Sequence, residues 1–417
     1  MNNAPEKKPP LLSKNLLLFM FAMVLANIGG SMYGPLLPLY LQDLGAAITQ
    51  IGLFFTLSMI IPLALQILGG WVSDSVGRLR AIAFGSLAGC LAYIALILAP
   101  TWGWLLLASG LMSIGTSLVS PSYDAFIAEN SNEANRARVF GISGALFTIV
   151  SVIGPLMGGY MAEEWGFKIM LTLAAVLYFV ATMIRIGMAR RAAKHQEANP
   201  TKLSLAGLKG NLGIMLGMLL AGGVVTWILI TDGVRDISFS LSFNLIPVYM
   251  EEIGGLTLKQ IGLINSIFGV CLMATTFPAG WLADHRGERV GIVLSFFIMA
   301  AALAVLIYMP AQLLWYYMLS WALFGVGVGL ADPAYKSLIS KAIPQHVRGT
   351  AYGLFSTSLG LVSLPAPWIG SQLWARFGPR VPFQITLIVT LLSTIPAWFK
   401  FKLPEKTEEQ SAVAPAD

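Results

Sequence analysis

Long runs of apolar residues alternate with short polar segments along almost the whole chain. Each run holds about 20 residues or more, which is the length that an α-helix needs to cross the hydrocarbon core of a bilayer. The pattern therefore predicts an all-α membrane protein with twelve transmembrane helices. We place the first six at 15–41, 50–73, 80–100, 103–129, 138–162 and 167–188, and the last six at 222–249, 257–283, 289–309, 312–337, 350–374 and 382–402.

The seventh helix is ambiguous, because residues 212–231 are apolar enough to form a span of their own. An internal repeat resolves the ambiguity. Pro38-Leu39-Tyr40 at the end of the first helix recurs as Pro247-Val248-Tyr249. The seventh helix should therefore end near Tyr249 and begin near residue 222, which leaves 203–221 as an interfacial helix or an extension.

The repeat is clearest in two polar turns. Gly70-Trp71-Val72-Ser73-Asp74-Ser75-Val76-Gly77-Arg78 returns as Gly280-Trp281-Leu282-Ala283-Asp284-His285-Arg286-Gly287-Glu288, followed by Arg289. Pro155 and Gly158 likewise match Pro367 and Gly370. We therefore expect two pseudo-symmetric six-helix bundles. The predicted segments are a tail at 1–14, a bundle at 15–189, a linker at 190–221, a bundle at 222–402 and a tail at 403–417.

Composition agrees with a membrane protein, since 56% of the 417 residues are hydrophobic and only 11% are charged. The net charge of +6 is carried by short loops, so it does not indicate nucleic-acid binding. Basic residues gather on one side, and the other side holds only Lys168, Lys259, Arg376 and Arg380. This bias predicts cytoplasmic termini in a multi-pass protein of the cell membrane. We place Arg235 as the one basic residue within a span.

The two turns resemble the cytoplasmic loop signature of the major facilitator superfamily, Gly-x-x-x-Asp-x-x-Gly-Arg-(Arg/Lys). The resemblance implies alternating access, with a substrate site between the two halves near the membrane midplane. It also implies that Arg78 meets Glu129 in a cytoplasmic latch with Asp74, which we expect to hold the outward-open state. Lys341 occupies the matching place in the second half, so the latch looks asymmetric. Ordinary interfacial charge is the alternative interpretation. The gating residues expected in these turns are Gly70, Asp74, Gly77, Arg78, Glu129, Gly280, Asp284, Gly287 and Arg289.

A second motif lies in the fifth predicted helix, where Gly154, Pro155, Gly158 and Gly159 follow Gly141. It resembles the antiporter signature of drug and metabolite exporters in the superfamily, except that Val150 replaces one glycine. Proline kinks a helix, and glycines let a facing helix approach closely. The motif favours export over import, although a bent and well-packed helix would have the same residues.

Charged residues inside the seventh helix are the main candidates for substrate binding or coupling. Asp232, Arg235 and Asp236 lie within about one helical turn, and Asp236 matches Asn27 of the first helix. A charge at the bilayer centre costs about 2.5–3.5 kcal/mol on insertion scales, so it must pair or face a polar cavity. We expect Arg235 to neutralise one aspartate and the other to bind a proton or a cationic substrate. A purely structural ion pair is the alternative.

The cavity of this fold is lined by the first, fourth, seventh and tenth helices. Candidate lining residues are Asn27, Tyr33, Ser113, Thr116, Ser120, Asn244, Trp321 and Asp332, each of which more often serves helix packing. Asp124 is either a latch member or a cavity residue. We expect the lining as a whole to be mostly apolar, with few hydrogen-bonding groups, which favours a hydrophobic or amphipathic substrate. The fourth helix lacks the arginine that proton-driven relatives carry, so proton coupling would use the seventh-helix cluster.

These features predict a proton-coupled exporter of small hydrophobic or amphipathic organic compounds. The alternative is a facilitator or importer of a metabolite whose charged group binds Asp232, Arg235 and Asp236. No nucleophile–base grouping or metal-ligand cluster is evident, so we expect neither an enzyme, a metal site nor a cofactor. The expected partners are a small-molecule substrate, protons and the lipid bilayer, with no nucleic acid, and we expect a monomer.

Overall fold

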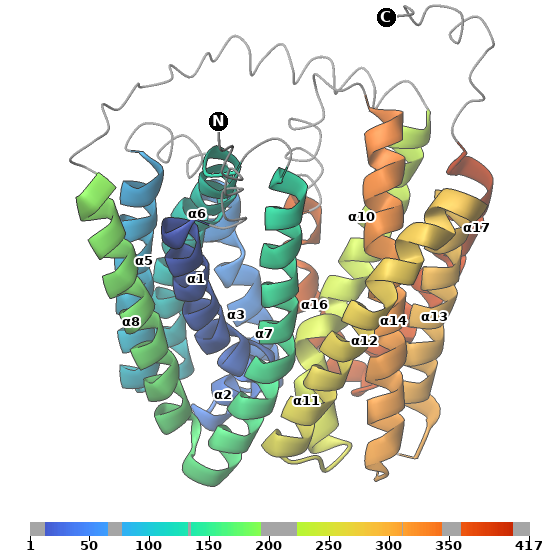
Figure 1. The fold of residues 1–417 in the computed structure, drawn as a ribbon. Helices are drawn as coiled ribbons and strands as arrows, with labels where there is room; N and C mark the ends of the chain where they lie inside the picture. The colour runs from blue at the N-terminus through green and yellow to red at the C-terminus, as the bar shows by residue number, and fades with distance from the viewer. Residues whose placement is uncertain are drawn as a thin grey trace, which may run out of the picture.

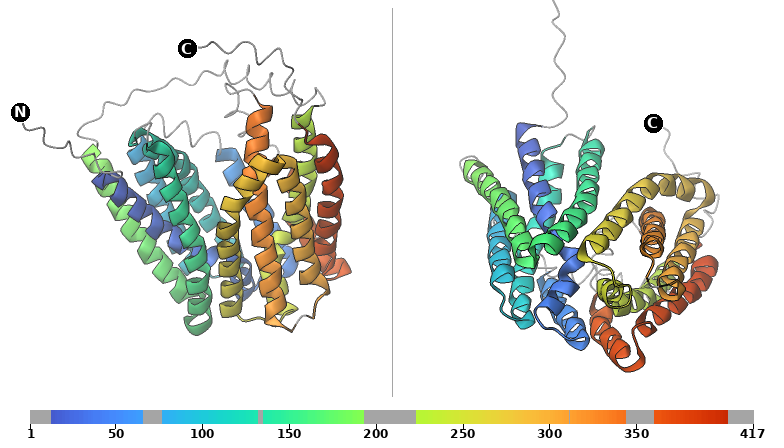
Figure 2. Two further views of the ribbon diagram at one scale, coloured as in Figure 1. Left: turned by 45° about the vertical axis from the view of Figure 1, so that its right-hand side comes forward. Right: turned by 90° about the horizontal axis from the view of Figure 1, so that it is seen from below.

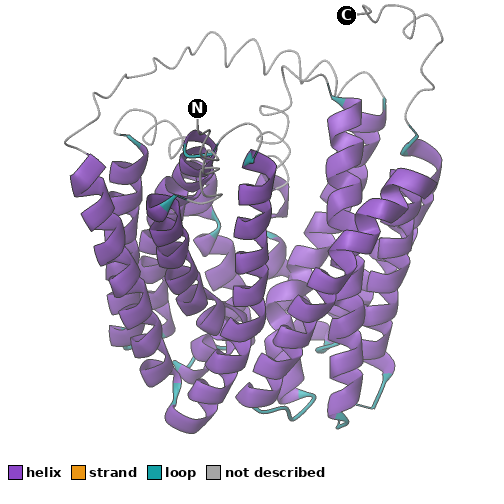
Figure 3. Ribbon diagram, viewed as in Figure 1, coloured by secondary structure: helices purple, strands orange, loops and turns teal. Residues whose placement is uncertain are grey.

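The computed structural model describes residues 13–65, 77–131, 135–192, 223–310, 312–343 and 360–402. Within these residues the chain is helical and contains no strand (Figure 3). Hydrocarbon offers the backbone no hydrogen-bond partners, and a helix satisfies its own amide and carbonyl groups.

The helices follow the predicted order. Those of the first half are α1 (Lys14–Tyr33), η1 (Gly34–Leu36), α2 (Leu37–Asp43), α3 (Ile48–Ser58), α5 (Arg78–Leu98), η2 (Trp102–Trp104), α6 (Leu105–Glu129), α7 (Arg136–Trp165) and α8 (Phe167–Ala192). Those of the second half are α10 (Val224–Ser242), η3 (Phe243–Leu245), α11 (Ile246–Glu252), α12 (Leu258–Arg286), α13 (Glu288–Tyr308), α14 (Leu314–Ala342), α16 (Ala366–Phe377) and α17 (Val381–Lys400). Two helices extend beyond their predicted ends. The helix α7 ends at Trp165 and not at residue 162, and α8 ends at Ala192 and not at residue 188.

Ten helices in the described ranges are long and apolar enough to cross a membrane. The segment α10 is not among them, because three charged residues interrupt its apolar run. Large apolar side chains such as Phe21, Leu91, Phe179 and Phe297 are more than half exposed on the surface of the bundle. An apolar outer surface of this extent fits contact with lipid.

The seventh helix begins at Val224 and ends at Glu252, which confirms that 212–231 is not a separate span. Residues 203–221, where we expected an interfacial helix, lie outside the described residues. The first and seventh helices are each interrupted by one 3₁₀ turn, η1 and η3, before a short helix that begins with Leu37-Pro38 or Ile246-Pro247. The same interruption in both halves extends the internal repeat from sequence to backbone conformation.

Helices of the same half pack against one another in two groups (Figure 1). In the first, α5 packs on α6 and α8, and α1 packs on α7 and α8. In the second, α14 packs on α12 and α13, and α17 packs on α10 and α13. The halves are joined mainly through α7 with α12 and α3 with α16, and the view from below shows the two halves side by side (Figure 2).

The halves meet at one end of the bundle. We call the end with Lys14 and Lys400 the basic end, and the end with Asp43 and Trp165 the opposite end (Figure 1). At the opposite end the Gln42 amide donates to Glu252 (2.7 Å), and the Leu258 amide donates to Glu163 (2.9 Å). Deeper in the bundle, the Ser266 hydroxyl donates to the carbonyl of Val152 (2.6 Å).

Candidate transport site

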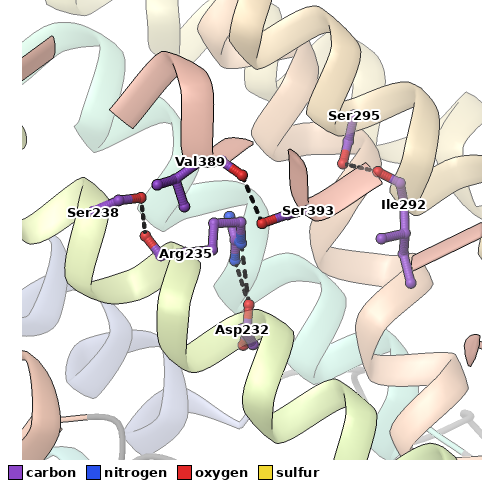
Figure 4. A network of polar contacts seen from close by, with 7 residues as sticks. All are labelled: Asp232, Arg235, Ser238, Ile292, Ser295, Val389 and Ser393. Carbon is purple, nitrogen blue, oxygen red and sulfur yellow. Dashed lines mark hydrogen bonds and ion pairs between the residues drawn. The ribbon is translucent and has the colours of Figure 1, made fainter. Parts of the chain in front are cut away.

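An ion pair occupies the middle of α10. The Arg235 guanidinium donates to Asp232 Oδ1 through Nη2 (2.6 Å) and Nε (3.2 Å), as Figure 4 shows. Both side chains are about one-fifth exposed. They lie three residues apart, a spacing that places them on one face of the helix. We expected Arg235 to neutralise one of the two aspartates of this helix, and that aspartate is Asp232.

Aromatic rings surround the Arg235 guanidinium. Its central carbon lies 5.6 Å from the ring centre of Phe239, 5.2 Å from that of Phe296 and 5.7 Å from that of Tyr335. The face of an aromatic ring attracts a cation, and the attraction grows where water is excluded. The C-terminal half thus buries a guanidinium that has both a carboxylate and several rings as partners.

Asp236 is not part of this ion pair. It lies one turn further along α10 from Asp232, and its carboxyl is within hydrogen-bonding reach of the buried Ser363 hydroxyl. A hydroxyl is a neutral partner, so Asp236 does not have the direct ion pair that Asp232 forms with Arg235. The cluster therefore contains one carboxyl fixed by arginine and one held by a neutral group.

A cavity of about 680 Å³ lies in the N-terminal half. It is bounded by α1, α5, α6, α7 and α8, and Asn27 and Tyr33 from our candidate list line it, as do Thr116 and Ser120. Asp124 also lines it, which answers the question of whether this residue faces the cavity. This volume is typical of a site for a drug-sized molecule.

The other candidates lie elsewhere. Ser113 is buried and donates to the carbonyl of Ser109 within its own helix. Trp321 is buried, and its indole donates to Asn265 (3.3 Å). Asp332 is exposed and pairs with Lys336 one turn later (2.7 Å), and Asn244 lies in the η3 turn. The structure does not bring these residues to the cavity of the first half.

One cavity residue escaped the sequence analysis. Arg185 of α8, which we had assigned to the cytoplasmic side, is only 1% exposed and lines the cavity. The signal that could have revealed it is the apolar sequence on both sides, since Arg185 falls inside the span Phe167–Arg191.

The glycine motif of α7 forms helix contacts both within and between the halves. Gly158 lies against the backbone of Met32 in α1, and Gly154 lies against Ser31. On another face, Gly159 lies against Gly262 of α12 in the other half. The motif therefore allows close helix approach on two sides.

The same contacts recur by symmetry. Gly370 of α16 lies against the backbone of Leu241 in α10, as Gly158 does against Met32. Gly262 lies against the Pro155 carbonyl, and Gly52 of α3 lies against the Pro367 carbonyl. The two junctions between the halves are thus built on equivalent glycine–proline contacts.

In the first signature turn, Gly70 and Asp74 lie outside the described residues. The final glycine of each turn has a positive φ, 94° at Gly77 and 87° at Gly287. Only glycine takes this conformation readily, and here it begins α5 and α13. Arg289 donates to the Trp398 carbonyl (3.2 Å) and lies over the Trp398 ring. Asp284 is exposed, and among the described residues no heavy atom lies within 4 Å of the position of a Cβ added at Gly280.

The expected latch pair is present, since Arg78 Nε lies 3.2 Å from Glu129 Oε1. The prediction of an asymmetric latch was wrong. In the second half Glu288, which follows Gly287 as Arg78 follows Gly77, forms an ion pair with Lys341. The second half therefore has the same pair with the charges exchanged. Each pair joins two helices of one half rather than the two halves.

Two helical bundles, a cavity within the first of them and charged side chains inside the spans are the features of a membrane transporter. The family model described as "Major Facilitator Superfamily" matches residues 19–231 and 228–416, and the chain belongs to this superfamily. Its fold is accordingly the predicted one, twelve helices in two halves.

Two relatives match over nearly their full lengths. The chain is 25% identical to an uncharacterized MFS-type transporter of Methanocaldococcus jannaschii, over 94% of this chain and 95% of the relative. It is 23% identical to the multi-drug resistance efflux pump PmrA of Streptococcus pneumoniae, over 95% and 98%. Among solved structures, a bacterial homologue of the iron transporter ferroportin in an inward-facing state superposes with a TM-score of 0.74. That match covers 93% of this chain and 98% of the other at 14% identity, so it supports the fold alone.

Proposed function

We propose that this transporter is a proton-coupled antiporter that exports small hydrophobic or amphipathic organic compounds from the cytoplasm. The basic end lies on the cytoplasmic side of the cell membrane, as the distribution of Lys and Arg predicts. The halves meet at the opposite end, and with this orientation the conformation is inward-facing. Arg78 and Glu129 are paired in this conformation too, so under this orientation their pair is not specific to the outward-open state.

The observation that carries the proposal is the different environment of two aspartates of α10. Arg235 compensates Asp232, whereas Asp236 contacts only a neutral hydroxyl among the partners named above. A carboxyl within a span that is not itself ion-paired is a suitable site for a proton, because ionisation there is costly. Asp236 is therefore the proton carrier, and the Asp232–Arg235 pair holds α10 in position.

Two further observations support export of apolar compounds. The exposed cavity wall is mainly apolar and aromatic, which suits the apolar body of such a compound. The α7 motif resembling the antiporter signature lies at the junction with α12, where a change of packing would alter access. PmrA, a relative of this chain along almost its whole length, is named an efflux pump.

Reconstituted proteoliposomes with an imposed pH gradient test the proposal. A panel of amphipathic dyes of positive, neutral and negative charge would be loaded, and dye movement would be followed by fluorescence. We expect movement against the proton gradient, collapse of movement when an ionophore dissipates the gradient, and loss of gradient dependence in Asp236→Asn. Folding of this variant should be intact, because the Asp232–Arg235 pair remains.

The matched control is Glu164→Gln, which removes an exposed carboxyl at the opposite end of α7. It should behave as the unmodified protein. Full gradient dependence in Asp236→Asn would remove Asp236 from the mechanism, and indifference of the whole panel to the gradient would overturn proton coupling.

A further inference from the structure

Each half encloses one guanidinium within its helices, Arg185 fully buried and Arg235 partly buried, and the two sites correspond under the internal repeat although the arginines come from different helices. Arg235 of α10 donates to Asp232. Arg185 of α8 donates through Nη2 to the Met23 sulfur (2.9 Å) and through Nη1 to the Ser86 hydroxyl (2.8 Å). Met23 holds in α1 the place that Asp232 holds in α10, by the same register that aligns Asn27 with Asp236.

Only one of these guanidinium groups has a carboxylate. Where Arg235 meets Asp232, Arg185 meets a thioether, which is a weak acceptor without charge. The Nε atom of Arg185 is buried and has no hydrogen-bond partner. Among the described residues, no carboxylate forms an ion pair with Arg185. A buried cation without a counter-ion is costly unless a ligand supplies the missing charge.

Arg185 belongs to the wall of the 680 Å³ cavity, together with four tyrosines, Tyr33, Tyr93, Tyr123 and Tyr178. The guanidinium lies over the Tyr178 ring at 5.8 Å, and the Tyr93 hydroxyl is buried without a partner. Aromatic walls bind the apolar body of a ligand, and unpartnered donors favour an acceptor. The site is therefore apolar over most of its surface and electropositive at one point.

Asp124 is the acidic group in the same wall, and it does not cancel Arg185. It is exposed, whereas Arg185 is almost fully buried, and the two form no ion pair. Solvent screens the exposed carboxylate far more than the buried guanidinium.

We infer that this cavity is a binding site for amphipathic organic anions, with a carboxylate or sulfonate drawn to Arg185 and an apolar or aromatic body against the tyrosines. The inference rests on the proposed function for the direction of transport only. It narrows the substrate class of that function to compounds with one acidic group. Binding itself is independent of proton coupling, so the two ideas can fail separately.

Equilibrium dialysis of the full-length protein in detergent tests the site with three probes of one size: 1-naphthoate, neutral 1-naphthamide and cationic 1-naphthylmethylamine. We expect naphthoate to bind about tenfold more tightly than naphthamide. A tenfold difference in affinity corresponds to roughly one charge-assisted hydrogen bond. Tighter binding of the amine than of the amide would overturn the inference and indicate recognition by Asp124.

Three variants locate the preference. Arg185→Met should bind both naphthoate and naphthamide with the weaker affinity, while Arg185→Lys should keep the preference. Met23→Asp retains Arg185 but supplies the carboxylate that Asp232 provides in the other half, so it too should abolish the preference. If Arg185→Met does not fold, Met23→Asp still tests whether Arg185 causes the preference for naphthoate. Persistence of the preference in Met23→Asp, or equal binding of naphthoate and naphthamide by the unmodified protein, would refute the site.

A thermal unfolding comparison separates a ligand site from a structural arginine. Arg185→Met leaves no orphaned carboxylate, so its unfolding temperature should equal or exceed that of the unmodified protein. Arg235→Met, the matched control, leaves Asp232 buried without its partner and should unfold several degrees lower. An equal loss in both variants would assign Arg185 to structure instead.

Discussion

Lys341 is paired with Glu288 at the place in the second half where Glu129 meets Arg78 in the first, with the positive and negative charges exchanged. Glu288 also accepts a hydrogen bond from Ser337 and is only 8% exposed. Both halves therefore have an ion pair at this place, although the cation comes from a different helix in each half. This indicates that the ion pair itself is required here.

The first prediction follows from this exchange. Glu288→Lys should place two cations together and lower the unfolding temperature, with a loss of about 1–3 kcal/mol, since the buried acceptor is removed. Glu288→Lys combined with Lys341→Glu should restore most of the stability. Asp332→Lys, which opposes the exposed Lys336 on the same helix, is the control and should cost less than about 1 kcal/mol. A double variant as unstable as the single one would show that charge pairing is not the cause.

The second prediction concerns the α10 ion pair. Asp232→Asn removes the counter-charge of buried Arg235 and should destabilise the protein by about 3–5 kcal/mol. Replacing both residues by apolar ones, Asp232→Leu with Arg235→Met, should recover most of that loss because no charge remains buried. Thermal unfolding in detergent measures both. Equal stability of Asp232→Asn and the unmodified protein would mean that the pair is solvated.

The third prediction tests the glycine contact between α12 and α7. A Cβ at Gly262 would meet the Pro155 carbonyl, so Gly262→Ala should force the helices apart at about 1–3 kcal/mol. Gly141→Ala on α7 is the matched control, because no heavy atom of the described residues lies within 4 Å of its added Cβ, and it should be neutral or slightly stabilising. Distances between spin labels on α7 and α12 should lengthen in Gly262→Ala only. Unchanged distances would mean that the contact adapts.

The fourth prediction concerns pH and the end at which the halves meet. Partial burial and the nearby carboxylates of Glu252, Glu163 and Asp43 raise the pKa of Glu251 above its usual value. A group whose pKa is raised in one conformation binds its proton more tightly there, so that conformation gains stability as the pH falls through the raised pKa. Closure at this end should therefore increase as the pH is lowered toward and below the ordinary glutamate range.

Spin labels at Trp165→Cys and Lys259→Cys would report this closure between pH 8 and pH 4. Glu251→Gln, which is neutral at every pH, should show a weaker pH dependence, and Glu164→Gln should not. An increase of the closed population with rising pH would contradict the prediction.

The sequence by itself determined the spans, their order and the duplication. Apolar runs of membrane length must be helical in lipid, because no other backbone partner exists there, and matching Pro-x-Tyr and glycine turns fix the register of the two halves. The same register correctly placed the seventh helix at Val224–Glu252. Spacing within one helix also indicated that Arg235 could pair with an aspartate.

Tertiary structure alone decided which groups meet across helices. Helix rotation and packing determine that Arg185 faces Met23 and Ser86, residues that are 162 and 99 positions away in the chain. They also determine that Lys341 has Glu288 as its partner 53 positions earlier. Local periodicity carries no information on such contacts, because a side chain on a helix can point toward lipid, a neighbour or a cavity without any change in its sequence neighbours.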